Sequence, residues 1–217
     1  MCSTKVLRHD GSMSEVVIRF ATADDVERIE QMRLQHAYPG DIALMGSVER
    51  AHRYASGRVK LDGIPNPSKV TVVADVADRV EGALQYTFGD DPDPATLAHV
   101  RLLISLLGPV GLIRGIPVLR ARRRVKIPVP TEAFRIFNLQ VDTSRHGQGI
   151  ATQLLGWADD EARHLGARRM ALLADSASPV VRLYERNGYR ITKTATDARY
   201  ERYANDPGRV LMEKNLV

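Results

Sequence analysis

Blocks of apolar and polar residues alternate along the chain and predict strands and helices in a mixed order. Continuous or alternating apolar runs predict strands at 16–21, 70–76, 80–88, 134–141, 170–174, 189–194 and 210–212. Apolar residues at helical spacing predict helices at 22–34, 42–55, 95–107, 150–165 and 178–188. A hairpin followed by alternating strands and helices predicts an α/β or α+β sandwich, in which a mixed sheet carries helices on both faces.

Length and composition fit one large domain. The chain has 217 residues, of which 44% are hydrophobic and 26% are charged, enough for a single core. The first fourteen residues are polar and contain no apolar run suited to a signal peptide. We therefore expect residues 1–14 to be a disordered tail or a cloning remnant and residues 15–217 to form one domain. The single cysteine, Cys2, excludes an intrachain disulfide and suits a cytoplasmic protein.

The region from about 95 to 127 is apolar and then basic, and we interpret it as an insertion. Glycines, prolines and Arg114 interrupt the apolar stretch 102–119, which argues against a membrane-spanning helix of about 20 apolar residues. Five basic residues follow within seven positions: Arg120, Arg122, Arg123, Arg124 and Lys126. The segment could be a hydrophobic lid packed on its own domain, a substrate lid or a dimer contact. It could also bind nucleic acid or an anionic membrane, although no interleaved aromatic residues support base stacking.

Residues 136–155 read as a strand, a polar turn with two glycines and a helix. Gly147 and Gly149 permit a sharp turn and the close approach of a ligand to the backbone. The first turn of the helix leaves N–H groups without intrahelical partners, and an anion can bind there. No Lys-Ser or Lys-Thr follows the second glycine as in a nucleoside-triphosphate loop, and Thr152 stands where a dinucleotide-binding motif has its last glycine. The sequence predicts a phosphate cradle for another type of ligand.

This cradle resembles that of the GNAT superfamily of N-acetyltransferases, which use acetyl-coenzyme A. The superfamily pattern is Arg or Gln, any two residues, Gly, any residue, then Gly or Ala, and 146–151 fits it except that His146 stands at the first position. The segments 183–189 (Leu-Tyr-Glu-Arg-Asn-Gly-Tyr) and 211–216 are also similar to superfamily elements. The resemblance covers about 134–216. It implies a mixed, mostly antiparallel central sheet flanked by helices on both faces.

The resemblance also implies how acetyl-coenzyme A would bind. The amides of the turn would hold the pyrophosphate, Leu139 would pair with the pantetheine arm like an added strand, and Val141 would present a backbone N–H to the oxyanion. Ser178 is either a helix N-cap or a residue that faces the cofactor. The residues expected at the cofactor are Leu139, Val141, His146, Gly147, Gln148, Gly149, Ile150, Ala151 and Ser178.

Acyl transfer from a thioester to an amine needs a neutral amine, an oxyanion donor and a proton for the departing thiolate. The resemblance implies that Tyr184 supplies the proton, whereas its helical position alone favours a packing residue. Superfamily members often place a Glu on or beside the strand 134–141, but this strand carries none. Glu132 precedes it and is our candidate base, with Glu81 and His99 as weaker ones. Water-mediated deprotonation without a single base is an equal alternative.

The sequence therefore predicts a cytoplasmic N-acetyltransferase that moves an acetyl group from acetyl-coenzyme A to a primary amine, by direct attack in a ternary complex. One alternative is a coenzyme A-binding domain without catalysis that acts as a sensor or interaction module. A weaker alternative is a nucleic-acid-binding protein that uses the 120–126 basic cluster. The six histidines show no metal-ligand spacing, so we expect no metal. The acceptor amine and the choice between monomer and homodimer stay open.

Overall fold

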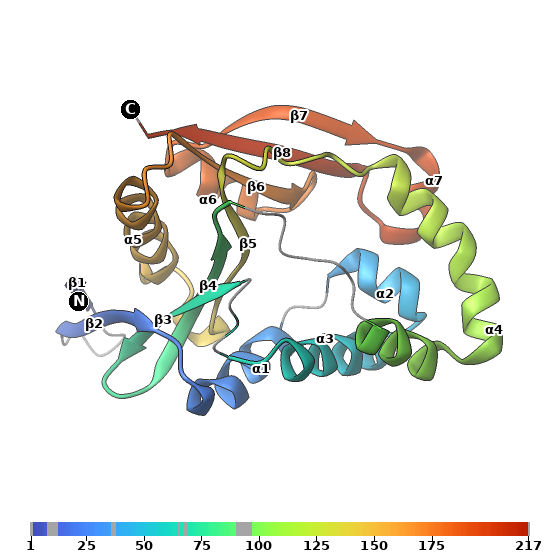
Figure 1. Cartoon of the computed structure of the whole chain (residues 1–217), viewed down its shortest axis with the longest axis horizontal. Helices are drawn as coiled ribbons and strands as arrows, with labels where there is room; N and C mark the ends of the chain where they lie inside the picture. Colours follow the sequence, from blue (N-terminus) through green and yellow to red (C-terminus); the bar gives the residue numbers. More distant parts are fainter. Residues whose placement is uncertain are drawn as a thin grey trace.

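A mixed eight-stranded sheet runs through the protein, and the computed structural model describes residues 2–7, 13–35, 38–64, 66, 69–89 and 97–216 (Figure 1). The strands are β1 (Cys2–Leu7), β2 (Met13–Phe20), β3 (Val70–Val76), β4 (Val80–Thr87), β5 (Phe134–Val141), β6 (Arg169–Asp175), β7 (Arg190–Thr196) and β8 (Gly208–Asn215). Their order in the sheet is β1-β2-β3-β4-β5-β6-β8-β7. Only β5 and β6 pair in parallel, so the sheet is mostly antiparallel and the predicted fold class is confirmed.

Helices cover both faces of this sheet and extend to one side of it (Figure 1). They are α1 (Val26–Leu34), α2 (Pro39–Met45), α3 (Val48–Asp62), α4 (Leu97–Arg124), α5 (Ile150–His164), α6 (Val180–Arg186) and α7 (Ala198–Ala204). Successive side chains of β3 point to opposite faces of the sheet and therefore belong to different core clusters. Val72 and Ala74 lie in the cluster that includes residues of α5 and α6, whereas Val73 packs with Ile29 of α1. A second helical layer of α2, α3, α4 and α7 continues beyond the sheet.

The two central strands β5 and β6 separate soon after they meet. Their parallel register covers only three pairs, which run from Phe134 with Met170 to Ile136 with Leu172. The register of β4 against β5 also shifts after Gln85, which leaves Phe137 without a partner on β4. A bulge of this kind bends a strand. The second half of β5 therefore has no ladder partner on its β6 side, where an extended ligand can add like a strand.

The structure corrects several element boundaries. Gly46, with φ of 78°, ends α2, and Ser47 caps α3 by accepting a hydrogen bond from Arg50 N at 3.2 Å. The expected helix over 42–55 is therefore two helices, and α3 continues to Asp62, beyond the expected end at 55. Helix α7, capped by Asp197, was not predicted. Cys2–Leu7 form β1 against β2, where the sequence predicts a disordered tail, because the backbone of this segment pairs with the edge of β2. The rest of the expected tail before β2 lies largely outside the described residues.

Helix α4 occupies the place of the expected insertion and bends sharply at Gly108, whose φ of 62° and ψ of 178° are not helical. The expected helix end at Gly108 and Pro109 is therefore a kink, and a second helical part follows. By length and composition alone α4 could cross a membrane, contrary to our reading of the interrupted stretch 102–119. That evidence is weak by itself, because the continuous parts 97–107 and 109–124 are each shorter than the roughly 20 residues of a spanning helix.

Candidate active site

The predicted cradle lies where β5 passes into α5 through a single 3-10 turn, Thr143–Arg145. Gly147 and Gly149 have φ of 78° and 80°, in the left-handed region that favours glycine, and Gly149 caps the helix. The first bond of α5 runs from Gln153 N to the carbonyl of Gly149, so the N–H groups of 150–152 precede the helical ladder. A Cβ placed on either glycine would meet nothing within 4 Å. The turn is thus open to a ligand, and its donors and helix dipole suit a pyrophosphate.

Two side chains of the cradle stabilise the turn by hydrogen bonds to backbone carbonyl groups. The Nε2–H of His146 donates to the carbonyl of Val141 at 3.1 Å, and the amide of Gln148 donates to the carbonyl of Ser144 at 3.4 Å. Ile150 is fully buried and packs in the main core. These contacts tie the side chains of His146 and Gln148 to the turn and to the end of β5.

Leu139 and Val141 lie on the part of β5 that has left β6. Leu139 is half-buried, Val141 is buried, and both belong to the main core or pack against it. Their β4 partners are Leu84 and Gly82. A Cβ on Gly82 would come within 2.9 Å of Ile150 and 3.1 Å of Leu154, so this glycine lets α5 approach the sheet closely. Close approach brings the first turn of α5 next to the free side of β5.

A buried ionic network supports the cradle on the α1 side. Arg28 of α1 donates to Asp142 Oδ2 at 2.6 Å and to Glu81 Oε2 at 2.8 Å. Asp142 also accepts from the amide and hydroxyl of Ser144 and from Gln35. Burial opposes the charged form of Asp142, but the hydrogen bonds from Ser144, Gln35 and Arg28 outweigh it and hold its pKa well below the ordinary value. Asp142, which the sequence suggests is a simple turn residue, joins α1, β4 and the turn.

We predict that Arg28→Met destabilises the protein by about 3 to 5 kcal/mol, because it leaves the buried carboxylates of Glu81 and Asp142 without their shared cation. Urea unfolding at neutral pH measures this loss. The lowered pKa of Asp142 contributes stability above its unfolded pKa of about 4. That contribution disappears as the pH falls below this value, so the difference between wild type and variant should shrink there.

The matched control is Arg163→Met, which removes an exposed Arg163–Asp160 pair within α5. We expect it to change stability by less than about 0.5 kcal/mol. Equal losses for the two variants would contradict a structural role for the Arg28 network.

Each of the three carboxylate and imidazole candidates for the base has a charged partner in the structure. Glu132 lies in the turn before β5, is exposed and pairs with Arg169, so it sits at the far end of β5 from Val141. Glu81 is buried and ion-paired with Arg28 and Arg145. His99 lies on α4, where its Nε2 is 2.9 Å from Asp62. The placement of Glu132 gives no support to it as the base.

Tyr184 lies on α6, is buried and stacks edge-on against Tyr189 with ring centroids 5.8 Å apart. Burial raises the pKa of Tyr184 above its ordinary value, and nearby Tyr38 raises it further. The phenol thus stays protonated at neutral pH and can donate a hydrogen bond. It is, however, a weaker acid than a free tyrosine. Before α6, Ser178 Oγ accepts from Val180 N at 3.4 Å, which is a capping contact placed one residue earlier than the true N-cap, Pro179.

Sequence reasoning missed Asp175, the last residue of β6. Burial raises its pKa, Arg209 opposes this from 3.5 Å, and Asp206 adds to the rise. Arg122 of α4 and Asp41 of α2 also act on it, so Asp175 faces the helical layer beside the sheet. Its position at the carboxyl end of a parallel strand is the signal that could have found it, because ligands of such sheets bind there.

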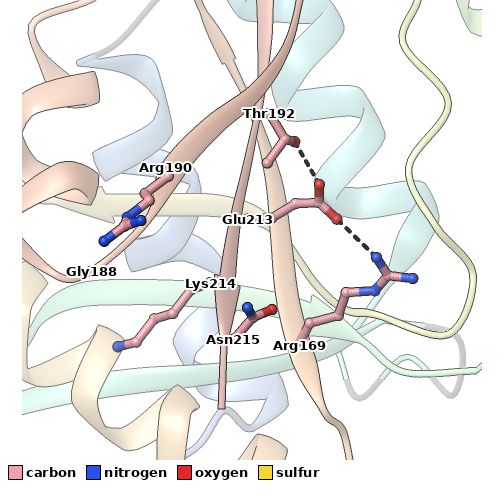
Figure 2. Close-up of a pocket in the computed structure, with 7 residues that line it drawn as sticks. All are labelled: Arg169, Gly188, Arg190, Thr192, Glu213, Lys214 and Asn215. Carbon is pink, nitrogen blue, oxygen red and sulfur yellow. Dashed lines mark hydrogen bonds and ion pairs between the residues drawn. The ribbon is translucent and has the colours of Figure 1, made fainter. Parts of the chain in front are cut away.

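A hollow is lined by residues of β6, β8 and β7 and by Gly188, and Figure 2 shows these residues. Thr192 donates to Glu213 at 2.5 Å, and Arg169 donates to the other oxygen of Glu213 at 3.5 Å. Arg190 and Lys214 lie on the other side of Glu213 (Figure 2), and Lys214 pairs with Asp159. Arg169 and Lys214 are each paired with a carboxylate, and we assign no catalytic role to this hollow. Within the described residues no group of three His, Cys, Asp or Glu side chains forms a metal site.

Comparison with known proteins agrees with the geometry. A family model described as acetyltransferase (GNAT) domain matches residues 108–191, which include the cradle and Tyr184. No curated protein matches by sequence.

Solved structures match over most of the chain. One, from Corynebacterium glutamicum and named histone acetyltransferase HPA2 and related acetyltransferase, has a TM-score of 0.61 at 15% identity and covers 92% of this chain and 96% of its own. The PaiA N-acetyltransferase of Thermoplasma acidophilum in complex with coenzyme A has a TM-score of 0.57 at 14% identity and covers 92% and 98%. The GNAT domain of S. lividans PAT has a TM-score of 0.54 at 18% identity and covers 98% and 96%. The resemblance to the GNAT superfamily is therefore confirmed: the chain has the GNAT fold, with a GNAT acetyltransferase domain match across its cradle.

Proposed function

We propose that the protein transfers an acetyl group from acetyl-coenzyme A to a primary amine, and that it does so in the cytoplasm. The single observation that carries this proposal is the open cradle of Gly147 and Gly149 beside the unpaired half of β5. The cradle suits the pyrophosphate, and the free edge of β5 suits the amide groups of pantetheine. The thioester would then lie along β5, with α6 and its Tyr184 on one side.

The chemistry follows as direct attack in a ternary complex. The amine nitrogen attacks the thioester carbonyl, and the backbone N–H of Val141 donates to the oxyanion. The tetrahedral intermediate collapses as the C–S bond breaks, and the nitrogen loses its remaining excess proton to solvent. Tyr184 donates a hydrogen bond to the departing thiolate. Because the raised pKa of Tyr184 makes it a weak acid, stabilisation of the thiolate is the larger part of its role, and the final proton can come from solvent.

We propose Asp175 as the group that binds the ammonium form of the acceptor and takes its proton. A base with a raised pKa accepts a proton more readily near neutral pH. The loop that follows Asp175 and leads to α6 is held by Asp206, which accepts from Ser176, Ala177 and Gly208. This assignment replaces Glu132.

Release of free thiol from acetyl-coenzyme A in the presence of a broad panel of primary amines tests the proposed function. Thiol release that depends on an amine, together with mass-spectrometric detection of the N-acetylated product and no acetylated protein, supports it. A second candidate, a coenzyme A-binding domain without catalysis, is favoured by the absence of any carboxylate on β5. Tight coenzyme A binding without turnover of any amine would establish that second function instead.

In an active preparation, Asp175→Asn should lower kcat by about 100-fold, because the amide cannot accept the proton. In the wild type, kcat/KM should rise with pH as Asp175 loses its proton, and this rise should be absent from the variant. Asp160→Asn is the control, since Asp160 is exposed on α5 and pairs only with Arg163 in the described structure. Unchanged kcat in Asp175→Asn would show that Asp175 is not the base and would favour deprotonation of the amine by water.

A further inference from the structure

Helix α4 exposes an apolar surface that the rest of the protein does not cover. Its inner side packs through Leu107, Val118 and Ala121 against α2, α3 and α7. The outer side carries Ile113, which is 70% exposed, and Val110, which is 61% exposed. The large apolar side chains exposed on this helix are Leu97, Val100, Ile104, Val110, Ile113, Ile116 and Leu119. Exposed apolar surfaces of this extent on one element mark binding sites.

The charges around this surface have one sign. Between Asp93 and Glu132 the sequence contains no Asp or Glu. Arg122 pairs with Asp41, and Arg124 with Asp197. The other arginines of α4 form no ion pair with any described residue: Arg101, Arg114, Arg120 and Arg123. The outer face of α4 is therefore apolar and positively charged. A complementary partner has an apolar and negatively charged surface.

The position of α4 leaves this face accessible. The helix forms the outer edge of the molecule, at the opposite end from α5 (Figure 1). The kink at Gly108 divides it into two short parts. Neither part is long enough to span a bilayer, but both can lie in the plane of a surface.

We propose that the outer face of α4 docks on an anionic phospholipid surface. Aliphatic side chains such as Ile113 enter the boundary between headgroups and acyl chains, while the unpaired arginines bind lipid phosphates and carboxylates. A second copy of this chain fits less well, because a two-fold contact would bring the same arginines together without an acid on this helix to neutralise them. Nucleic acid also fits less well, because residues 97–131 contain no Phe, Tyr or Trp to stack on bases. The proposal does not depend on acetyl transfer.

Flotation of the full chain with vesicles tests the proposal. We expect binding to vesicles of phosphatidylcholine mixed with phosphatidylserine and much weaker binding to phosphatidylcholine alone. Affinity should fall as salt is added, because the arginines act through charge. Replacing Arg114 and Arg120 by Gln should weaken binding by about fivefold for each arginine.

The apolar part is tested with a charge-matched pair of variants. Ile113→Glu on α4 should weaken vesicle binding by about tenfold or more, because a buried contact is lost and a charge is placed against the anionic lipid. Leu61→Glu on α3 makes the same change in charge at a side chain that is 46% exposed, and it should retain more of the wild-type binding. Circular dichroism and thermal melting establish that both variants are folded.

Three outcomes would overturn the proposal. The first is no binding to the phosphatidylserine vesicles at low salt, or equal loss in the two variants. The second is a dimer in size-exclusion chromatography with light scattering that Ile113→Glu dissociates, which would assign the face to a second copy. The third is tighter binding to duplex or single-stranded DNA than to vesicles, unaffected by Ile113→Glu, which would assign the arginines to nucleic acid.

Discussion

Gly149→Val should weaken the binding of acetyl-coenzyme A by roughly 100-fold, because at least two charge-assisted hydrogen bonds from the cradle to the pyrophosphate would be lost. Gly149 has φ of 80°, which a β-branched residue adopts only with strain. The new side chain would also project into the open side of the turn, where nothing in the protein lies within 4 Å of a Cβ. Calorimetric titration with coenzyme A measures the loss. A thermal melt should show destabilisation of about 1 to 3 kcal/mol.

Gly156→Ala is the control in the same helix. Gly156 lies in the middle of α5, where an added Cβ meets nothing within 4 Å. Alanine should leave coenzyme A binding unchanged and raise stability by up to about 1 kcal/mol. If Gly149→Val binds coenzyme A as tightly as Gly156→Ala does, the pyrophosphate does not bind at this turn.

Tyr184→Phe should lower kcat by about 10- to 100-fold and leave KM for acetyl-coenzyme A nearly unchanged, because the hydroxyl acts on the thiolate that forms only as the C–S bond breaks. The ring would still fill its place in the core. Stability should therefore change by no more than about 1 kcal/mol. Steady-state kinetics with the best amine from the panel measures both constants.

Tyr189→Phe is matched to this change. Tyr189 is also a buried tyrosine, it contacts the ring of Tyr184, and its hydroxyl donates to the sulfur of Met170 at 3.5 Å. It should keep wild-type kcat. Full activity in Tyr184→Phe would show that the hydroxyl is not needed for catalysis. Tyr184 would then be a packing residue only.

Local patterns were sufficient to predict the part of the fold that forms the cradle. The strand 134–141 matches β5, and the two glycines adopt the positive φ that their place in the turn predicts. These features depend on a continuous segment, so periodicity and glycine content report them directly. Functional assignment of the cradle nevertheless required the resemblance, because any phosphate ester could bind such a turn.

Features that depend on distant segments could not be read from the sequence. Asp142 reads as an ordinary turn residue, and only the fold brings Arg28 to it from α1. Asp175 reads as the end of a strand, and its raised pKa comes mainly from burial in the folded protein, with Asp206 raising it further and Arg209 of β8 opposing the rise. Glu132 is close to β5 in sequence but pairs with Arg169 at the far end of the strand. Proximity of Glu132 to β5 along the chain did not place it near Val141 and the cradle.

The apolar and basic segment that forms α4 is another case in which the sequence predicts local structure but not the surroundings of its side chains. Its pattern predicts a helix over 95–107 that stops at Gly108, whereas α4 begins at Leu97, is kinked at Gly108 and continues to Arg124. Whether its apolar residues face the domain or solvent depends on how α2, α3 and α7 cover it. They pack against the side of α4 that carries Leu107, Val118 and Ala121, and a lid packed on its own domain does not account for the exposed apolar side chains of this helix.

Calorimetric titration with acetyl-coenzyme A and with acetyl-pantetheine tests the central claim most directly. If the cradle of 146–151 holds the pyrophosphate, acetyl-coenzyme A should bind with one-to-one stoichiometry. Acetyl-pantetheine, which lacks the pyrophosphate and the nucleotide, should bind at least about 100-fold more weakly. Equal affinities of the wild-type protein for the two compounds, or no binding of acetyl-coenzyme A, would contradict the account.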